Sequence, residues 1–104
     1  MQEFKVMVPG AVAVDTIEVT SPFDCSVVGT VERIDDRGAE LALNTADKLF
    51  KDRSRWLSVH ERVSVLEKTA ELMQLQFDDL VNLSLSEGGK PYADSQVEVA
   101  RAID

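Results

Sequence analysis

One long amphipathic stretch, residues 58–91, constrains the fold more than any other part of the chain. Its apolar residues recur at alternating steps of three and four, which is the spacing of one face of an α-helix. Neighbouring apolar positions widen this face, so we expect the helix to pack against two other elements. The residues that define the face are Val63, Leu66, Ala70, Met73, Phe77 and Leu80.

The two ends of this predicted helix carry clear signals. Ser58 and Glu61 have the spacing of a capping box, in which each residue satisfies a free N–H of the other. Gly88-Gly89 supplies a left-handed C-cap, and Pro91 cannot continue the helix. Asp78-Asp79 could cap a second segment, so we expect a long helix over 58–88 that is broken or kinked near residues 76–78.

The rest of the chain predicts a β-hairpin and two more helices. Residues 12–34 are rich in β-branched residues on either side of a turn at 21–25, and residues 3–8 could form a short strand or arm. A helix over 35–51 follows, and another starts at Pro91. Because the sequence stops at Asp104 without a helix terminator, we expect a truncated helix over 91–104. The apolar face of helix 35–51 consists of Ala39, Ala42, Leu43, Ala46, Leu49 and Phe50.

These elements predict an α+β, helix-rich fold within one partial domain, residues 1–104. The chain has 104 residues and a net charge of −8, so it repels phosphate backbones and anionic lipid surfaces; neither nucleic acid nor membrane is an expected partner. No apolar run approaches the roughly 20 residues that span a bilayer. A single cysteine cannot form an internal disulfide, which fits a reducing compartment, and we expect a cytoplasmic protein.

The residues offer no catalytic centre of their own. Cys25 and His60 could in principle form a nucleophile and base, but Cys25 lies in a predicted turn and His60 in the first turn of a distant helix, so we expect neither to be catalytic. Gly89-Lys90 resembles the end of a phosphate-binding loop. However, Ser84 stands where the first glycine is needed and Pro91 where a hydroxyl residue is needed.

Several strings, taken in order, carry a resemblance: Val19–Pro22, Val27–Val31, Glu61-Arg62, Gly89-Lys90-Pro91 and Glu98-Val99. Their order and spacing over residues 16–104 are similar to the N-terminal stretch of the NAD(P)-dependent aldehyde dehydrogenase superfamily. The departures are Gly88 for the usual Thr or Ser, Ser21 for the usual Asn, and Asp24-Cys25 for the frequent Thr-Gly. The expected fold is therefore a fragment of the α/β fold of that family.

The resemblance implies an enzyme that oxidises an aldehyde to a carboxylic acid. In the family a Cys attacks the carbonyl to form a thiohemiacetal, hydride passes to NAD or NADP, and a Glu-activated water releases the acyl group. All of these parts lie downstream of the segment that this chain resembles, so it implies no catalytic and no cofactor-binding residue here. Some members hold a monovalent cation through carbonyls at positions matching Val19 and Thr20 and an acidic residue matching Glu98. Glu98 is therefore the one candidate metal ligand.

We accordingly expect the chain alone to be inactive and to bind no cofactor. Its partners would be the remainder of the enzyme chain and, in the absence of that remainder, further copies of itself. Two alternatives stay open at this point. One is a free-standing acidic helical module whose amphipathic helix binds a partner protein; the other, less favoured, is a small thiol enzyme that uses Cys25. The sequence specifies neither the aldehyde nor the choice between NAD and NADP.

Overall fold

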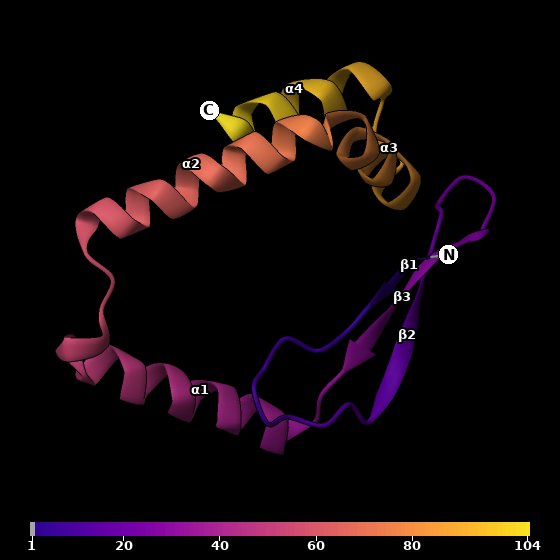
Figure 1. Ribbon diagram of the computed structural model, residues 1–104. Coiled ribbons are helices and arrows are strands. Elements are labelled where there is room, and N and C mark those ends of the chain that lie inside the picture. Colours follow the sequence, from indigo (N-terminus) through magenta and orange to yellow (C-terminus); the bar gives the residue numbers. More distant parts are fainter. Residues whose placement is uncertain (1) are drawn as a thin grey trace. The chain divides into compact units, whose positions relative to one another are not determined.

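A computed structural model describes residues 2–104 (Figure 1). The helix-rich α+β class, with an N-terminal hairpin followed by helices, is confirmed. The short strand or arm considered for residues 3–8 is a strand at Gln2–Phe4, and the long helix is divided in two near the expected position. The elements are β1 (Gln2–Phe4), β2 (Asp15–Thr20), β3 (Val27–Arg33), α1 (Asp36–Lys51), the 3₁₀ turn η1 (Arg53–Arg55), α2 (Val59–Leu75), α3 (Phe77–Gly88) and α4 (Tyr92–Ile103).

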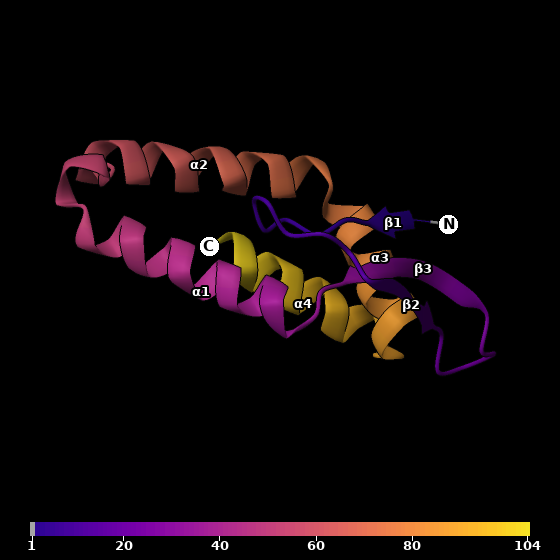
Figure 2. The same cartoon turned by 90° about the horizontal axis from the view of Figure 1, so that it is seen from below.

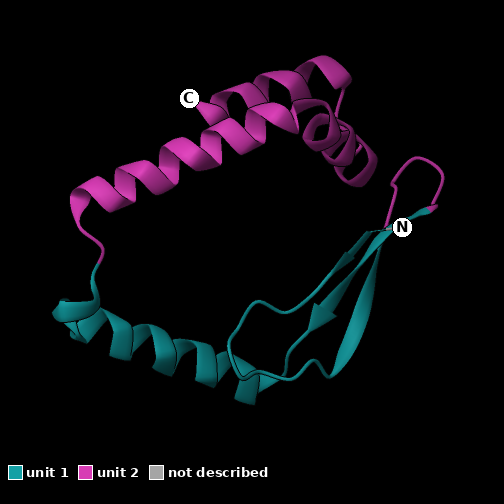
Figure 3. Ribbon diagram, in the orientation of Figure 1, with its two compact units in different colours: residues 1–19, 27–56 teal, residues 20–26, 57–104 magenta. Residues whose placement is uncertain are grey.

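The contacts group the chain into two compact units, coloured separately in Figure 3. Unit 1 holds the residues up to Val19 together with Val27–Trp56, and therefore contains most of the sheet and α1. Unit 2 holds the hairpin turn Thr20–Ser26 together with Leu57–Asp104, and therefore contains α2, α3 and α4.

The sheet of unit 1 has the strand order β1-β3-β2. β1 pairs in parallel with β3, with Gln2 opposite Gly29 and Phe4 opposite Val31. Gly29 is buried, and a Cβ added to it would lie 2.8 Å from the backbone oxygen of Gln2. The absence of a side chain at Gly29 therefore lets β1 approach β3 closely.

β2 and β3 form the predicted hairpin. The Val14 N–H donates to the Arg33 carbonyl at the open end, and the Ser21 N–H donates to the Ser26 carbonyl at the turn, both over 2.9 Å. Residue numbers thus rise along one strand as they fall along the other, which is antiparallel pairing. Arg33 also forms a bidentate ion pair with Asp15, and this carboxylate raises the pKa of the Arg33 guanidinium.

Side chains cap both ends of α1. The Asp35 carboxylate accepts from the Gly38 N–H over 2.9 Å, as expected for an N-cap residue. At the other end the Trp56 indole N–H donates to the carbonyls of Phe50, over 3.1 Å, and Leu49, over 3.3 Å. The Phe50 and Trp56 rings lie 5.5 Å apart. The indole therefore satisfies carbonyls that the last helical turn leaves free.

α2 and α3 together correspond to the predicted long helix. The capping box is present: the Ser58 hydroxyl accepts from the Glu61 N–H over 3.2 Å, and the Glu61 carboxylate accepts from the Ser58 N–H over 2.7 Å. The expected break occurs at Gln76, whose N–H is shared between the Leu72 and Met73 carbonyls at 3.1 Å each. The chain changes direction between α2 and α3 (Figure 1).

α4 turns back to pack on α3, next to which it lies in Figures 1 and 2, and it also contacts α2, though less extensively. Val81 of α3 and Ser95 of α4 are completely buried. Coverage of the α2 face is uneven, because Ala70 and Met73 are half-buried whereas Leu66 remains exposed. The periodicity therefore identified the apolar face, but only the half of α2 next to α3 and α4 is covered.

Candidate functional site

The corner between α3 and α4 is constrained at Gly89. Gly89 ends α3 in the left-handed region, with a φ of 65°. The ring of Pro22, from the hairpin turn, packs against it, so that an added Cβ at Gly89 would lie 2.7 Å from Pro22 Cγ. Two separate requirements, positive φ and close approach, therefore favour glycine at this position.

Lys90 and Glu98 pair across this corner. The Lys90 ammonium donates to both carboxylate oxygens of Glu98, each over 2.7 Å, and both side chains are about half exposed. A cation bound by Glu98 would compete with this ammonium for the carboxylate oxygens. Within residues 2–104, no three His, Cys, Asp or Glu side chains gather as a metal would require. The cation site at Glu98 stays a prediction.

The hairpin turn holds Cys25 in a constrained conformation. Cys25 has a φ of 60°, a conformation that non-glycine residues rarely adopt, and its N–H donates to the Ser21 carbonyl over 2.9 Å. The Asp24 carboxylate accepts from both the N–H and the hydroxyl of Ser26, and these bonds lower the pKa of Asp24. Cys25 is exposed, and no hydrogen bond among the described residues joins it to His60. Its position is that of a turn residue.

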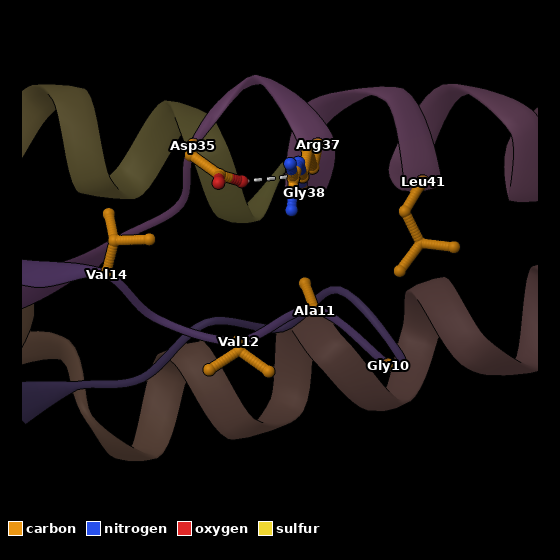
Figure 4. A pocket seen from close by; sticks show the side chains of 8 residues that line it. All are labelled: Gly10, Ala11, Val12, Val14, Asp35, Arg37, Gly38 and Leu41. Atoms are coloured by element: carbon orange, nitrogen blue, oxygen red, sulfur yellow. Dashed lines mark hydrogen bonds between the residues drawn. The ribbon is translucent and has the colours of Figure 1, made fainter.

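A cavity in unit 1, which the sequence did not indicate, lies between the loop before β2 and the start of α1 (Figure 4). Its volume is about 300 Å³. Figure 4 shows Ala11 pointing from the loop toward α1 and Leu41 pointing from α1 toward the loop. The lining is formed by Gly10, Ala11, Val12, Val14, Asp35, Arg37, Gly38 and Leu41.

The start of α1 does not fit a dinucleotide phosphate, although it follows a strand as phosphate-binding helices often do. The Gly38 N–H already donates a hydrogen bond to the Asp35 carboxylate, and the negative charge of this carboxylate would repel a phosphate. Gly38 serves packing instead, since a Cβ added to it would lie 2.7 Å from Ile34 Cβ. The turn that would have to bind phosphate is therefore closed by its own side chains.

Unit 1 and unit 2 thus define a structural segment, with a strand–helix unit and a helical corner but no assembled catalytic centre among the described residues. The aldehyde dehydrogenase family model matches residues 10–104. The chain belongs to the aldehyde dehydrogenase family, as its motifs had indicated.

Three relatives illustrate the breadth of the match. Glutarate-semialdehyde dehydrogenase of Pseudomonas putida is 38% identical over 87 residues, which cover 84% of this chain and 18% of the relative. Succinate-semialdehyde dehydrogenase [NADP(+)] 2 of Schizosaccharomyces pombe is 32% identical over 81% of this chain and 17% of the relative. 1-Pyrroline-5-carboxylate dehydrogenase 2 of Bacillus subtilis is 33% identical over 75% of this chain and 15% of the relative. The chain therefore spans less than a fifth of the length of these relatives.

None of the helices among the described residues is both long and apolar enough to cross a membrane.

Proposed function

We propose that this chain is the N-terminal portion of an NAD(P)-dependent aldehyde dehydrogenase and is catalytically inert by itself. The observation that carries the proposal is the family match over residues 10–104 in a chain that covers only 18% of a relative such as the Pseudomonas putida enzyme. In the longer protein, a Cys would attack the aldehyde, NAD or NADP would accept the hydride, and a Glu would activate the water that releases the acid.

The role proposed for this segment is support of the cofactor-binding domain. Large apolar side chains that a finished domain would cover are exposed here, among them Leu66 at 68% and Leu75 at 82% on α2. The remainder of the enzyme chain is the proposed partner for these residues. We propose a cytoplasmic location. The relatives named above differ in substrate, so their names leave the aldehyde open.

Inertness can be tested directly on the 104-residue protein. NADH or NADPH formation is followed at 340 nm with glutarate semialdehyde and succinate semialdehyde, with either cofactor, beside the Pseudomonas putida enzyme as a positive control. We expect no rate above buffer, because the exposed Cys25 has no hydrogen bond to a base among the described residues.

The variant Cys25→Ser separates this proposal from the thiol-enzyme alternative. An aldehyde-dependent rate in the wild-type chain that disappears in Cys25→Ser would contradict inertness and make Cys25 a nucleophile. A rate that is unchanged in Cys25→Ser would indicate a contaminating dehydrogenase. In that case the assay is repeated with protein purified through an additional, different column, and a contaminant's rate should disappear.

A further inference from the structure

The segment between α1 and α2, residues 52–58, joins the two compact units, and we call it the linker. Unit 1 ends at Trp56, and unit 2 resumes at Leu57 (Figure 3). The 3₁₀ turn η1 lies within the linker and packs on α1, a helix of the same unit. All residues of the linker are exposed. Exposed connections held by local contacts are where endoproteases cut folded proteins.

The linker also carries two residues that a protease can select, Arg53 and Arg55. A protease binds its substrate as an extended chain, so a basic residue inside a helix or strand must first be freed by local unfolding. Lys90 lies outside the helices but is followed by Pro91, and a bond to a proline nitrogen is a poor substrate for trypsin-like enzymes. The basic residues inside helices or strands are Arg33, Arg37, Lys48, Arg62, Lys68 and Arg101.

Two further basic residues lie at the ends of elements, and hydrogen bonds hold the bond that follows each of them. After Lys5, the Val6 N–H donates to the Glu32 carboxylate of β3 over 2.9 Å. After Lys51, the Asp52 N–H donates to a carbonyl in the last turn of α1 over 3.1 Å. The Lys51 ammonium is itself paired within α1. Both sites are therefore attached to regular structure, and the linker is the more accessible target.

Within the linker, the bond after Arg55 is the least constrained. The Trp56 N–H makes one long hydrogen bond, of 3.3 Å, to the Arg53 carbonyl. The Arg55 guanidinium forms no ion pair with the described residues, so it is free to enter the acidic specificity pocket of a trypsin-like enzyme. The Arg53 guanidinium instead lies over the Trp56 ring, 4.6 Å from its centroid. Arg55 is therefore the better of the two arginines for such a pocket.

We propose that the linker is a processing site for an endoprotease that cleaves after arginine, and that the Arg55–Trp56 bond is cut first. Water adds across this amide: its oxygen joins the Arg55 carbonyl carbon, which becomes a carboxylate, and the Trp56 nitrogen takes up protons and becomes an ammonium. The products are residues 1–55 and 56–104. The cut also separates α1 from the indole that caps its last carbonyls.

The test is limited digestion of the 104-residue protein with trypsin, followed over time by intact-mass spectrometry. We expect the first two products to be residues 1–55 and 56–104. Arg53→Gln combined with Arg55→Gln should slow the loss of intact chain at least tenfold. The matched control combines Arg62→Gln with Arg101→Gln, which removes the same charge from exposed arginines of α2 and α4, and it should leave the rate within about twofold of the wild type.

A second measurement needs no variant. A lysine-specific endoprotease, matched to trypsin on an unfolded peptide that contains both residue types, should consume the intact chain at least tenfold more slowly than trypsin. This comparison decides the matter if circular dichroism shows that the linker variant has lost helix content. The proposal would be overturned by first products that end at any residue other than Arg55, by equal rates for the two paired variants, or by equal rates for the two proteases.

Discussion

Replacing Ser95 by alanine should make the chain more stable. Ser95 is completely buried in α4, and its hydroxyl has no hydrogen-bond partner among the described residues. A buried polar group left without a partner costs about 1–3 kcal/mol, and alanine is also the better helix former by up to about 0.7 kcal/mol. Removing one oxygen leaves only a small void, so the gain outweighs the packing loss. We expect Ser95→Ala to raise the free energy of unfolding by about 1–2 kcal/mol.

The assay is urea unfolding followed by circular dichroism at 222 nm, with the m-value required to stay constant between variants. Ser64→Ala is the matched control, because Ser64 is an exposed residue in the middle of α2. That change reports helix propensity alone, and we expect a gain of no more than about 0.5 kcal/mol. If Ser95→Ala is less stable than the wild type while Ser64→Ala behaves as expected, the Ser95 hydroxyl has a partner and the reasoning is refuted.

Two substitutions and one pH titration test the local geometry. Gly89→Ala should lower the free energy of unfolding by about 2 kcal/mol, because the new Cβ would be held at a φ of 65° and would lie 2.7 Å from Pro22 Cγ. The control Gly88→Ala should leave the free energy of unfolding nearly unchanged in the same urea assay. Cys25→Gly should stabilise by about 0.5–1 kcal/mol by removing a side chain at a φ of 60°; a destabilised variant would show that Cys25 makes contacts beyond the turn. Hydrogen bonds from the Ser58 N–H and hydroxyl hold the pKa of Glu61 below its ordinary value. The stability that this cap contributes is therefore fully present at pH values above the ordinary pKa of a Glu, and it is lost as the pH falls through the lowered pKa of Glu61 in the folded chain. We therefore expect the first turn of α2 to fray in acid. A carbon-13 NMR titration of the Glu61 carboxyl that gives an ordinary or raised pKa would contradict the assignment.

The parts of the fold that could be predicted are those that local chemistry determines. The capping box of Ser58 and Glu61, the break at Gln76 and the left-handed Gly89 each depend on residues within one helical turn. For the strand β1, the sequence only suggested a short strand or arm. β1 pairs in parallel with β3 and so joins residues 27 positions apart, such as Gln2 and Gly29. This pairing is made by backbone atoms, so no side-chain pattern in the sequence predicts it.

The candidate site was less accessible to sequence reasoning. The resemblance directed attention to Glu98 as a cation ligand, but only the turn at Gly89 brings the Lys90 ammonium onto that carboxylate, eight residues away. The cavity beside Leu41 depends on a loop folding against a helix that follows much later in the chain. Periodicity showed that α1 has an apolar face, but it contains no information about what covers that face.

The most direct test of the account is a chimera. Residues 10–104 of this chain replace the matching segment of the Pseudomonas putida glutarate-semialdehyde dehydrogenase, and NADH formation from glutarate semialdehyde is measured beside the parent enzyme and a variant that lacks the segment. We predict a folded chimera with a rate within about tenfold of the parent, and no activity without the segment, because the segment supports a catalytic centre that lies elsewhere. A chimera that folds and assembles but forms no NADH would contradict the central claim.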